Sequence, residues 1–297
     1  MSLLERLRSG DRLVSDGAMG TLLMEAGLQP GEAPEAMVLR APDAVRGVAE
    51  AYLLAGADIV HTNTFGASSL KLAEVGLEDR AAEISRRAVE LARDAVGESA
   101  YVSVSVGPCG RMLEPYGDTD EDTVFRSFLE QIEVARDAGA DLVTVETMID
   151  PREAVQAVRA AKHVADTLPV LVTLTFDLTP VGFRTVMGTS VAQAAEAVAG
   201  AGADVVGSNC GNGVEVMVEV ARALRAATKA PLLIQANAGV PEIRDGAVFY
   251  PESAADFAAA TPALLDAGVS IIGGCCGTTP EHIRAVKRAV QDHRQGS

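Results

Sequence analysis

Aromatic residues are scarce in this sequence, which has no Trp and only 7 Phe and 4 Tyr among 297 residues. Long apolar runs are missing too, and none approaches the ~18 residues that a membrane-spanning helix needs. The first residues carry charges at Glu5, Arg6 and Arg8 and lack the apolar segment of a secretory signal. We therefore expect no membrane association and a cytoplasmic location.

Basic residues are also few, with 25 Lys and Arg against 41 Asp and Glu and a formal net charge of −16. Binding to nucleic acid requires clustered Lys and Arg, so we expect no nucleic-acid partner. The acidic excess is most simply a solvated surface. The lysines fall on predicted helices or on loops before strands, which argues against a lyase that forms a Schiff base: Lys71, Lys162, Lys229 and Lys287.

Cysteine is rare as well, with four residues in the chain. Since 48% of the residues are hydrophobic, the chain can bury a large core without disulfides. Two of the cysteines, Cys275 and Cys276, are neighbours, and such pairs seldom have the geometry of a relaxed disulfide. In a cytosolic chain these cysteines favour metal binding or catalysis over a disulfide framework.

What the sequence does contain is an internal repeat. The segment LLAGADIVHTNT at 53–64 recurs as DAGADLVTVET at 137–147, as AGAGADVVGSN at 199–209 and more loosely at 266–275. Each copy predicts a helix that ends at Gly, followed by a short apolar strand without polar alternation, as in parallel strands buried on both faces. Four further runs predict strands of the same kind: 12–16, 101–106, 169–176 and 231–237.

Eight strands that alternate with helices could form an open, doubly wound sheet. Eight strands in fewer than 300 residues favour a closed barrel instead, because closure removes the edge strands. The sequence therefore predicts an α/β fold, a single (β/α)8 TIM barrel that occupies residues 1–297 as one domain. Two helix starts are marked by capping signatures, Asp150–Pro151 with Glu153, and Thr278 with Glu281.

Unusual residues gather where the predicted strands end, which is where such barrels carry their chemistry. All four cysteines follow strand ends, and Cys210, Cys275 and Cys276 come from strands two apart around the barrel. We expect these three to converge, since the flanking glycines let the backbone bend. Three thiolates resemble an open zinc site with one position for water or substrate. The simpler alternative is that the cysteines are only small buried residues.

A thiolate-rich zinc site suits one chemistry in particular. Zinc binds a substrate sulfur and keeps it deprotonated near neutral pH, so that it can attack a methyl group. Two other uses stay open at this point. One is hydrolysis by zinc-bound hydroxide, for which Glu146 is the evident base. The other is a zinc-binding module without catalysis.

Five motifs carry a family resemblance: DGAMGT (16–21), HTNTFGAS (61–68), GSNCGNG (207–213), NAG (237–239) and GGCCGTTPEH (273–282). From about residue 10 to 292 the chain resembles the homocysteine methyltransferase family. That family includes the homocysteine-binding module of cobalamin-dependent methionine synthase and betaine–homocysteine methyltransferase. GGCCGTTPEH with the upstream Asn–Cys is highly specific, whereas DGAMGT alone is not.

The resemblance implies that the three cysteines, Cys210, Cys275 and Cys276, bind Zn²⁺ and that the sulfur of homocysteine joins them as a ligand. Asn237 would be a candidate fourth ligand in the absence of substrate. Glu146 would hold the substrate amino group, and Asp16, Gly17 and Thr62 would line the amino-acid end of the pocket, with Glu146 and Asp16 as the catalytic carboxylates.

Each of these side chains also has a structural interpretation. Glu146 could be a supporting acid, Asp16 could order the turn before Gly17, and Thr62 could be a buried hydroxyl bonded to backbone. We expect His61 to be a satisfied histidine at a strand end and assign it no role. Cys109 stands where the family usually has Thr, and we expect a packed residue there, although a fourth ligand stays open.

The methyl donor is less well defined by the sequence. A methylcorrinoid protein could dock in trans, or a small molecule such as betaine or S-methylmethionine could deliver the methyl group. A cationic donor is best held by an aromatic cage, and the aromatic residues near the rim are few: Phe65, Tyr116, Phe176 and Phe183. This slightly favours cobalamin on a partner protein, with homocysteine as acceptor; another small thiol stays an alternative.

Overall fold

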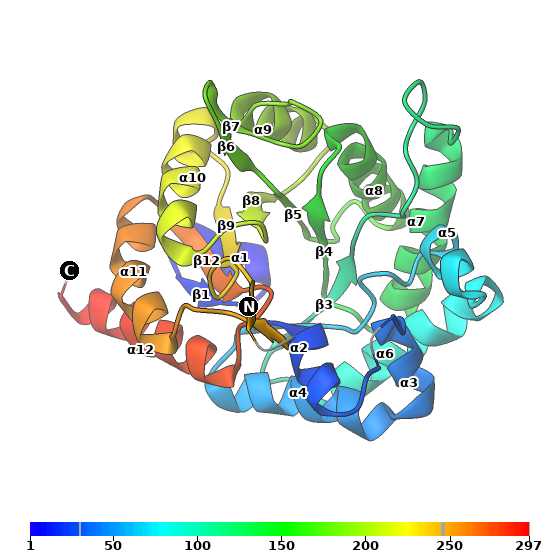
Figure 1. The fold of residues 1–297 in the computed structure, drawn as a ribbon, viewed down its shortest axis with the longest axis horizontal. Helices are drawn as coiled ribbons and strands as arrows, with labels where there is room; N and C mark the ends of the chain where they lie inside the picture. Colours follow the sequence, from blue (N-terminus) through cyan, green and yellow to red (C-terminus); the bar gives the residue numbers. More distant parts are fainter. Residues whose placement is uncertain (30, 245–246, 297) are drawn as a thin grey trace.

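The computed structural model describes residues 1–29, 31–244 and 247–296. In this part of the chain eight parallel strands form one sheet in the order β1-β12-β9-β8-β5-β4-β3-β2. A parallel bridge between Ser15 and Ile59 joins the two ends of that order and closes the ring. The predicted TIM barrel is confirmed (Figure 1). The strands are β1 (Leu13–Val14), β2 (Ile59–His61), β3 (Tyr101–Val106), β4 (Leu142–Met148), β5 (Val170–Leu174), β8 (Val205–Asn209), β9 (Leu232–Ala236) and β12 (Val269–Gly274).

Helices surround the ring of strands, as Figure 1 shows. The long ones are α4 (Pro42–Ala55), α6 (Ala81–Val96), α7 (Glu121–Asp137), α8 (Pro151–Val164), α9 (Val191–Gly200), α10 (Val214–Ala227), α11 (Ala254–Asp266) and α12 (Pro280–Gly296). The loops at the carboxyl ends of the strands carry short elements: α2 (Met19–Glu25), α3 (Met37–Arg40), α5 (Ser69–Leu72), the 3-10 turns Pro34–Ala36, Ala73–Val75 and Glu78–Arg80, and the hairpins β6–β7 (Asp177–Thr179, Gly182–Arg184) and β10–β11 (Glu242–Arg244, Ala247–Phe249).

The barrel has an interior core of its own, separate from the layer between strands and helices. Large side chains from seven strands fill its lower part: Leu13, Ile59, Leu142, Leu171, Val205, Leu233 and Ile271. Leu3 and Leu7 of α1 (Leu3–Arg8) pack against them. This helix, labelled α1 at the centre of Figure 1, therefore plugs the amino end of the barrel and leaves the opposite end for the site.

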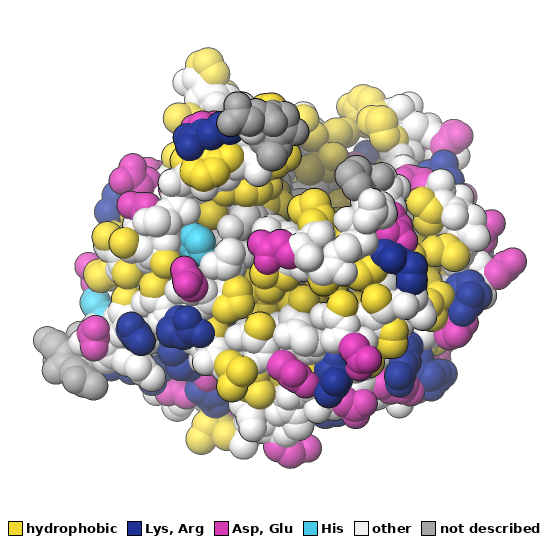
Figure 2. Space-filling view, turned by 60° about the horizontal axis from the view of Figure 1, so that its bottom comes forward, with side chains coloured by type: hydrophobic (Ala, Val, Ile, Leu, Met, Phe, Trp, Pro, Cys, Tyr) yellow, Lys and Arg dark blue, Asp and Glu magenta, His cyan; other side chains and the backbone are white. Residues whose placement is uncertain are grey.

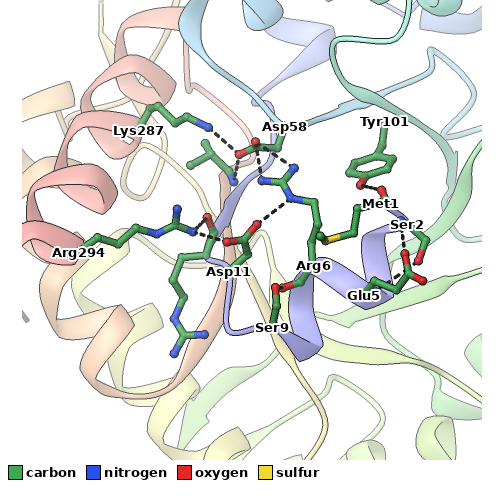
Figure 3. Close-up of polar contacts among 12 residues, drawn as sticks. Met1, Ser2, Glu5, Arg6, Ser9, Asp11, Asp58, Tyr101, Lys287 and Arg294 are labelled. Atoms are coloured by element: carbon green, nitrogen blue, oxygen red, sulfur yellow. Dashed lines mark hydrogen bonds and ion pairs between the residues drawn. The ribbon is translucent and has the colours of Figure 1, made fainter.

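The repeated Gly-Ala-Asp has a structural cause at this lower end. Asp58, Asp141 and Asp204 each accept a hydrogen bond from a backbone N–H of the neighbouring strand, β1, β3 and β5 respectively, at 2.7–2.9 Å. Each also pairs with a cation; Asp58 bonds both Arg6 of α1 and Lys287 of α12 (Figure 3). The aspartates of the repeat thus connect neighbouring strands, and Asp58 also holds α1 against the barrel.

The capping signatures predicted at two helix starts are confirmed only in part. Asp150 caps α8 as predicted, since its side chain accepts from the N–H of Arg152. Glu153 does not complete a capping box, because it accepts from the N–H of Cys109 at 2.7 Å. The prediction at Thr278 is wrong: α12 begins at Pro280, one residue later than expected, and the Thr278 hydroxyl instead donates to the carbonyl of Cys275 at 2.7 Å.

The surface agrees with the acidic composition. On the face drawn in Figure 2, Lys and Arg side chains lie among Asp and Glu side chains rather than in one basic patch. Among the residues described, we find no helix that is both long and apolar enough to cross a membrane.

Candidate functional site

Three cysteines meet at the carboxyl end of the barrel. The Sγ atoms of Cys210, Cys275 and Cys276 all lie within 4.8 Å of one another, and those of Cys210 and Cys276 are 4.0 Å apart. Cys210 follows β8 and the pair follows β12, with β9 between those strands in the sheet. The predicted convergence of residues 65 positions apart is therefore a feature of the structure.

Backbone geometry turns these side chains toward one point. Cys210 has φ 61°, a left-handed conformation that is uncommon for a residue with a side chain, and Gly211 follows with φ 75°. Directly after β12, the N–H of Cys275 donates to the carbonyl of Ala236 at 2.7 Å and fixes the start of the vicinal pair. Strain of this kind persists only where the surroundings impose it, and it is concentrated at functional sites.

The three thiols share their protons unequally. Hydrogen bonds from Cys275 and Cys276 lower the pKa of the Cys210 thiol far below its usual value. The same contacts raise the pKa of Cys275 and Cys276. One thiolate therefore forms easily, while a second and third are opposed by the first charge and by burial. A dication would offset that repulsion, so the donor set fits a soft metal such as zinc.

Asn237 lies beside the cluster. Its side chain is close enough to Cys210 to help lower the pKa of that thiol. Its Oδ1 atom is buried and has no hydrogen-bond partner within the described ranges. A buried amide oxygen without a partner costs free energy, which a metal or a water could recover. The environment of Asn237 is thus compatible with a fourth ligand.

Asn209 organises the same region, and sequence reasoning gave it no role. Its Oδ1 accepts from the N–H of Thr147 at 2.7 Å and from the hydroxyl of Thr173 at 2.8 Å. Its Nδ2 donates to the Thr147 hydroxyl at 2.7 Å and to Cys275 Sγ at 3.6 Å. Thr147 is held at φ 62° by this clamp. Asn209 therefore connects the end of β4 to the thiol cluster.

A cavity of about 590 Å³ opens beside the cysteines, within the range of small-molecule sites. Its inner wall includes the three cysteines and polar side chains in, or directly after, β2, β3, β4 and β9: His61, Thr62, Ser105, Glu146 and Gln235. Its outer wall is formed by α2, the segment that precedes α3, Phe65 and α5. One cavity thus joins the thiols to polar groups at one end and to the outer loops at the other.

Glu146 faces this cavity from the end of β4. Burial raises the pKa of its carboxyl, opposed mainly by the charge of His61 and by a hydrogen bond from the Ser105 hydroxyl. A carboxylate in such a place gains from a cationic partner, as the sequence argument required.

Asp16 lies behind His61 rather than in the cavity wall. One oxygen accepts from the backbone N–H of His61 at 2.7 Å and the other contacts His61 Nδ1 at 2.6 Å. Both carboxylate oxygens are therefore engaged by one residue. The direct substrate role expected of Asp16 stays a prediction.

His61 is the residue that sequence reasoning most undervalued. Its imidazole is buried, lines the cavity, and has no hydrogen-bond partner for Nε2 among the residues the structure describes. Burial lowers its pKa, but the charge of Asp16 and the hydrogen bond to it outweigh burial and raise the pKa to about 9. The expectation of a satisfied histidine holds for Nδ1 and fails for Nε2. The sequence signal for a role of His61 was its position in HTNT, at the end of a predicted strand.

Gly17 and Thr62 both line the cavity. A Cβ at Gly17 would lie 2.6 Å from the Thr278 hydroxyl and 2.8 Å from that of Tyr52, so only glycine fits there. The Thr62 hydroxyl is 2.6 Å from that of Thr64 and accepts from the N–H of Ser105 at 3.4 Å. Thr62 therefore also has the structural role considered above, and the packing around Gly17 requires a glycine.

Cys109 does not join the cluster. Its side chain is fully buried in the helix-facing core, and burial raises the pKa of its thiol to about 12. Within the ranges described, the group that could hold a metal contains the other three cysteines. Cys109 is a packed residue, as expected.

Comparison with known proteins gives one consistent result. The family described as homocysteine S-methyltransferase matches residues 13–290. Among curated proteins, methionine synthase of Mycobacterium leprae is 33% identical over 302 residues, which cover 96% of this chain and 25% of that protein. Methionine synthase of Mycobacterium tuberculosis is 32% identical, covering 94% and 24%. The chain thus spans about a quarter of the length of these relatives.

A solved structure agrees. The metallated form of the homocysteine methyltransferase MmuM from Escherichia coli superposes with a TM-score of 0.78 at 26% sequence identity, covering 95% of this chain and 97% of that one.

Proposed function

Because the chain belongs to the homocysteine S-methyltransferase family, we propose that it transfers a methyl group to the thiol of homocysteine and so forms methionine. The observation that carries this proposal is the meeting of three thiols at one wall of a cavity whose neighbouring wall bears polar groups suited to an amino acid. Residues 1–297 would form a single homocysteine-binding domain.

Cys210, Cys275 and Cys276 would hold Zn²⁺, with Asn237 as a fourth ligand in the absence of substrate. When bound, zinc would supply a site that keeps the incoming thiol deprotonated near neutral pH. Support comes from the donor set itself, in which one thiolate forms easily and the others need a positive charge nearby. The unpaired Oδ1 of Asn237 supports its part.

The remaining residues would orient the substrate. Glu146 would bind the α-ammonium group, with Ser105 holding its carboxylate in place. Gly17 and Thr62 would line the amino-acid end. Asp16, which is bonded to His61, would line it with them and be the second catalytic carboxylate beside Glu146. The substrate sulfur attacks the methyl carbon; an S–C bond forms as the donor–methyl bond breaks, and its electron pair leaves with the donor.

A methylcorrinoid protein that docks at the mouth of the barrel is the donor we favour. The loops at the carboxyl ends of the strands expose apolar side chains that the barrel does not use: Met112, Tyr116, Leu178, Val181, Ile243 and Val248, each at least 56% exposed. Exposed apolar surface of this kind is typical of sites for a protein partner. The relatives, four times as long as this chain, have room for such a partner within one polypeptide.

A small cationic donor is the second candidate, favoured by the outer part of the cavity. Glu32, Glu35 and Glu74 line it beside the apolar side chains of Met24 and Phe65. Glu35 is buried, which raises the pKa of its carboxyl, and a sulfonium or quaternary ammonium group would stabilise its charge.

One assay separates these donors. The zinc-loaded protein is incubated with homocysteine and, in parallel, methylcobalamin, betaine or S-methylmethionine, and methionine is quantified. We expect methionine from methylcobalamin. Methionine only from betaine or S-methylmethionine would replace the corrinoid donor with the cationic one. X-ray absorption at the zinc edge should gain a sulfur contribution when homocysteine is added; an unchanged spectrum would contradict the whole proposal.

A further inference from the structure

We propose that His61 is a substrate-binding residue, held by Asp16 as a buried imidazolium whose Nε2–H binds the carboxylate of an α-amino-acid thiol. This inference rests on the proposed function and deepens it, because it restricts the acceptors to thiols that carry a carboxylate next to their amino group.

The first step is geometric. His61 is 7% exposed, and its ring belongs to the wall of the cavity that contains the three cysteines. Nδ1 lies 2.6 Å from Asp16, and the backbone N–H of His61 is bonded to the same carboxylate, so this pair fixes the orientation of the ring. A buried nitrogen without a partner in the described chain is costly unless a ligand occupies the position.

The second step concerns charge. Asp16 is an acceptor for Nδ1, so that Nδ1 carries a hydrogen and Nε2 is the atom whose protonation decides the state of the ring. The adjacent carboxylates, Asp16 on one side and Glu146 on the other, both favour the cation. A protonated Nε2 is a donor and therefore selects an anionic acceptor such as a carboxylate.

The third step is the pairing of His61 with Glu146. Both line the same cavity, and each affects the charge of the other without a hydrogen bond between them in the described structure. An imidazolium beside a carboxylate is complementary to the zwitterionic head of an amino acid, whose carboxylate and ammonium groups are adjacent. The thiol at the other end of such a ligand would point to the cysteines.

A role as a general base is less consistent with these contacts. A base must be neutral before it accepts a proton, and both neighbouring carboxylates stabilise the protonated ring instead. A purely structural role would leave Nε2 buried without a partner in the described chain, at a cost in free energy that nothing offsets.

The test compares two thiols that differ in one group. Homocysteine and 3-aminopropane-1-thiol share the thiol, the amine and the chain length, but only homocysteine has the carboxylate. Dissociation constants of both are measured by calorimetry on the zinc-loaded protein and on His61→Gln. We expect His61→Gln to weaken homocysteine binding by roughly 10- to 100-fold and to change the binding of the amine thiol less than about threefold. His163→Gln, at an exposed histidine of α8, is the matched control and should change neither.

Two results would overturn the inference: an equal loss for both thiols, or no selective loss for homocysteine. If His61→Gln does not fold, Asp16→Asn provides a second variant, since it retains the ring and weakens its charge. For that variant we expect the KM for homocysteine to rise with little change in kcat, and the amine thiol to be affected much less. An equal effect on both thiols would again contradict the inference. Failure of the proposed function looks different, because then homocysteine would add no sulfur to the zinc in the unmodified protein.

Discussion

Replacing Cys275 by Ala should remove the metal without unfolding the barrel. Zinc bound by structural sites contributes roughly 10–16 kcal/mol. If the three thiolates share this about equally, the loss of one removes roughly 3–5 kcal/mol and weakens the site by about 10²- to 10⁴-fold. Cys275 is half-buried at the rim and is outside the apolar clusters of the core. The free energy of unfolding of the metal-free protein should therefore change by less than about 1 kcal/mol.

Cys109→Ser is the matched control, because Cys109 is a rim cysteine outside the cluster and fully buried. A Ser hydroxyl there can donate to the carboxylate of Glu153, which contacts the Cys109 thiol, so the free energy of unfolding should change by less than about 1 kcal/mol. The two variants should thus differ in metal content alone: Cys275→Ala loses the metal and Cys109→Ser keeps it. Metal content after dialysis is read by mass spectrometry, and stability by urea unfolding of the metal-free proteins.

Stoichiometric zinc in Cys275→Ala after dialysis against a weak chelator would refute the assignment of the ligands. Loss of zinc in Cys109→Ser would do the same, since it would show that metal content follows general damage to the rim rather than the removal of a particular sulfur.

Three further predictions concern the barrel and its buried charge. Gly207→Ala should cost at least about 4 kcal/mol of stability or prevent folding, because a Cβ there would overlap the Leu233 carbonyl. Its control, Gly47→Ala in α4, should raise stability by about 0.5–1 kcal/mol, since a Cβ there meets nothing within 4 Å. Equal melting temperatures of the two variants would contradict the close approach of β8 and β9. Asp58→Asn should lower the free energy of unfolding by about 1–2 kcal/mol, because it weakens the ion pairs with Arg6 and Lys287. Asp43→Asn is the control: the Asp43 carboxylate is 93% exposed in its ion pair with Arg46, so urea unfolding should not change. The pKa of His61 is raised from 6.5 to about 9, so its protonation should contribute up to about 3 kcal/mol to the free energy of unfolding. This contribution should be complete below pH 6.5 and lost as the pH rises through 9. If the free energy of unfolding of His61→Gln has the same pH slope as that of the unmodified protein, the prediction is contradicted.

Much of the fold could be predicted from the sequence because its signals are local. The copies of Gly-Ala-Asp mark the boundary between helix and strand, and buried parallel strands are continuous apolar runs. Their number and spacing then leave few ways to close a sheet. The meeting of Cys210 with Cys275 and Cys276 follows from the same topology, since residues at the carboxyl ends of parallel strands share one rim of the barrel.

The sequence was less informative about which partner a polar side chain bonds. Thr278 has the residue type of a helix cap, but its hydroxyl bonds the backbone of Cys275, and α12 begins later. Glu153 resembles a capping-box acid and instead bonds the loop at Cys109. Short polar side chains have several partners within reach, and the choice among them depends on which loop the tertiary structure brings near.

The sequence by itself determined the closed barrel, the rim that carries the chemistry and the three sulfurs that meet there, because strand period and topology fix which residues face one end. Only the tertiary structure decided that both oxygens of Asp16 bond His61, that Asn209 bonds Thr147 and Cys275, and that His61 Nε2 is buried without a partner in the described chain. Those contacts join strands far apart in the chain. They depend on side-chain direction and on distances of a few ångströms, which no pattern of residue types records.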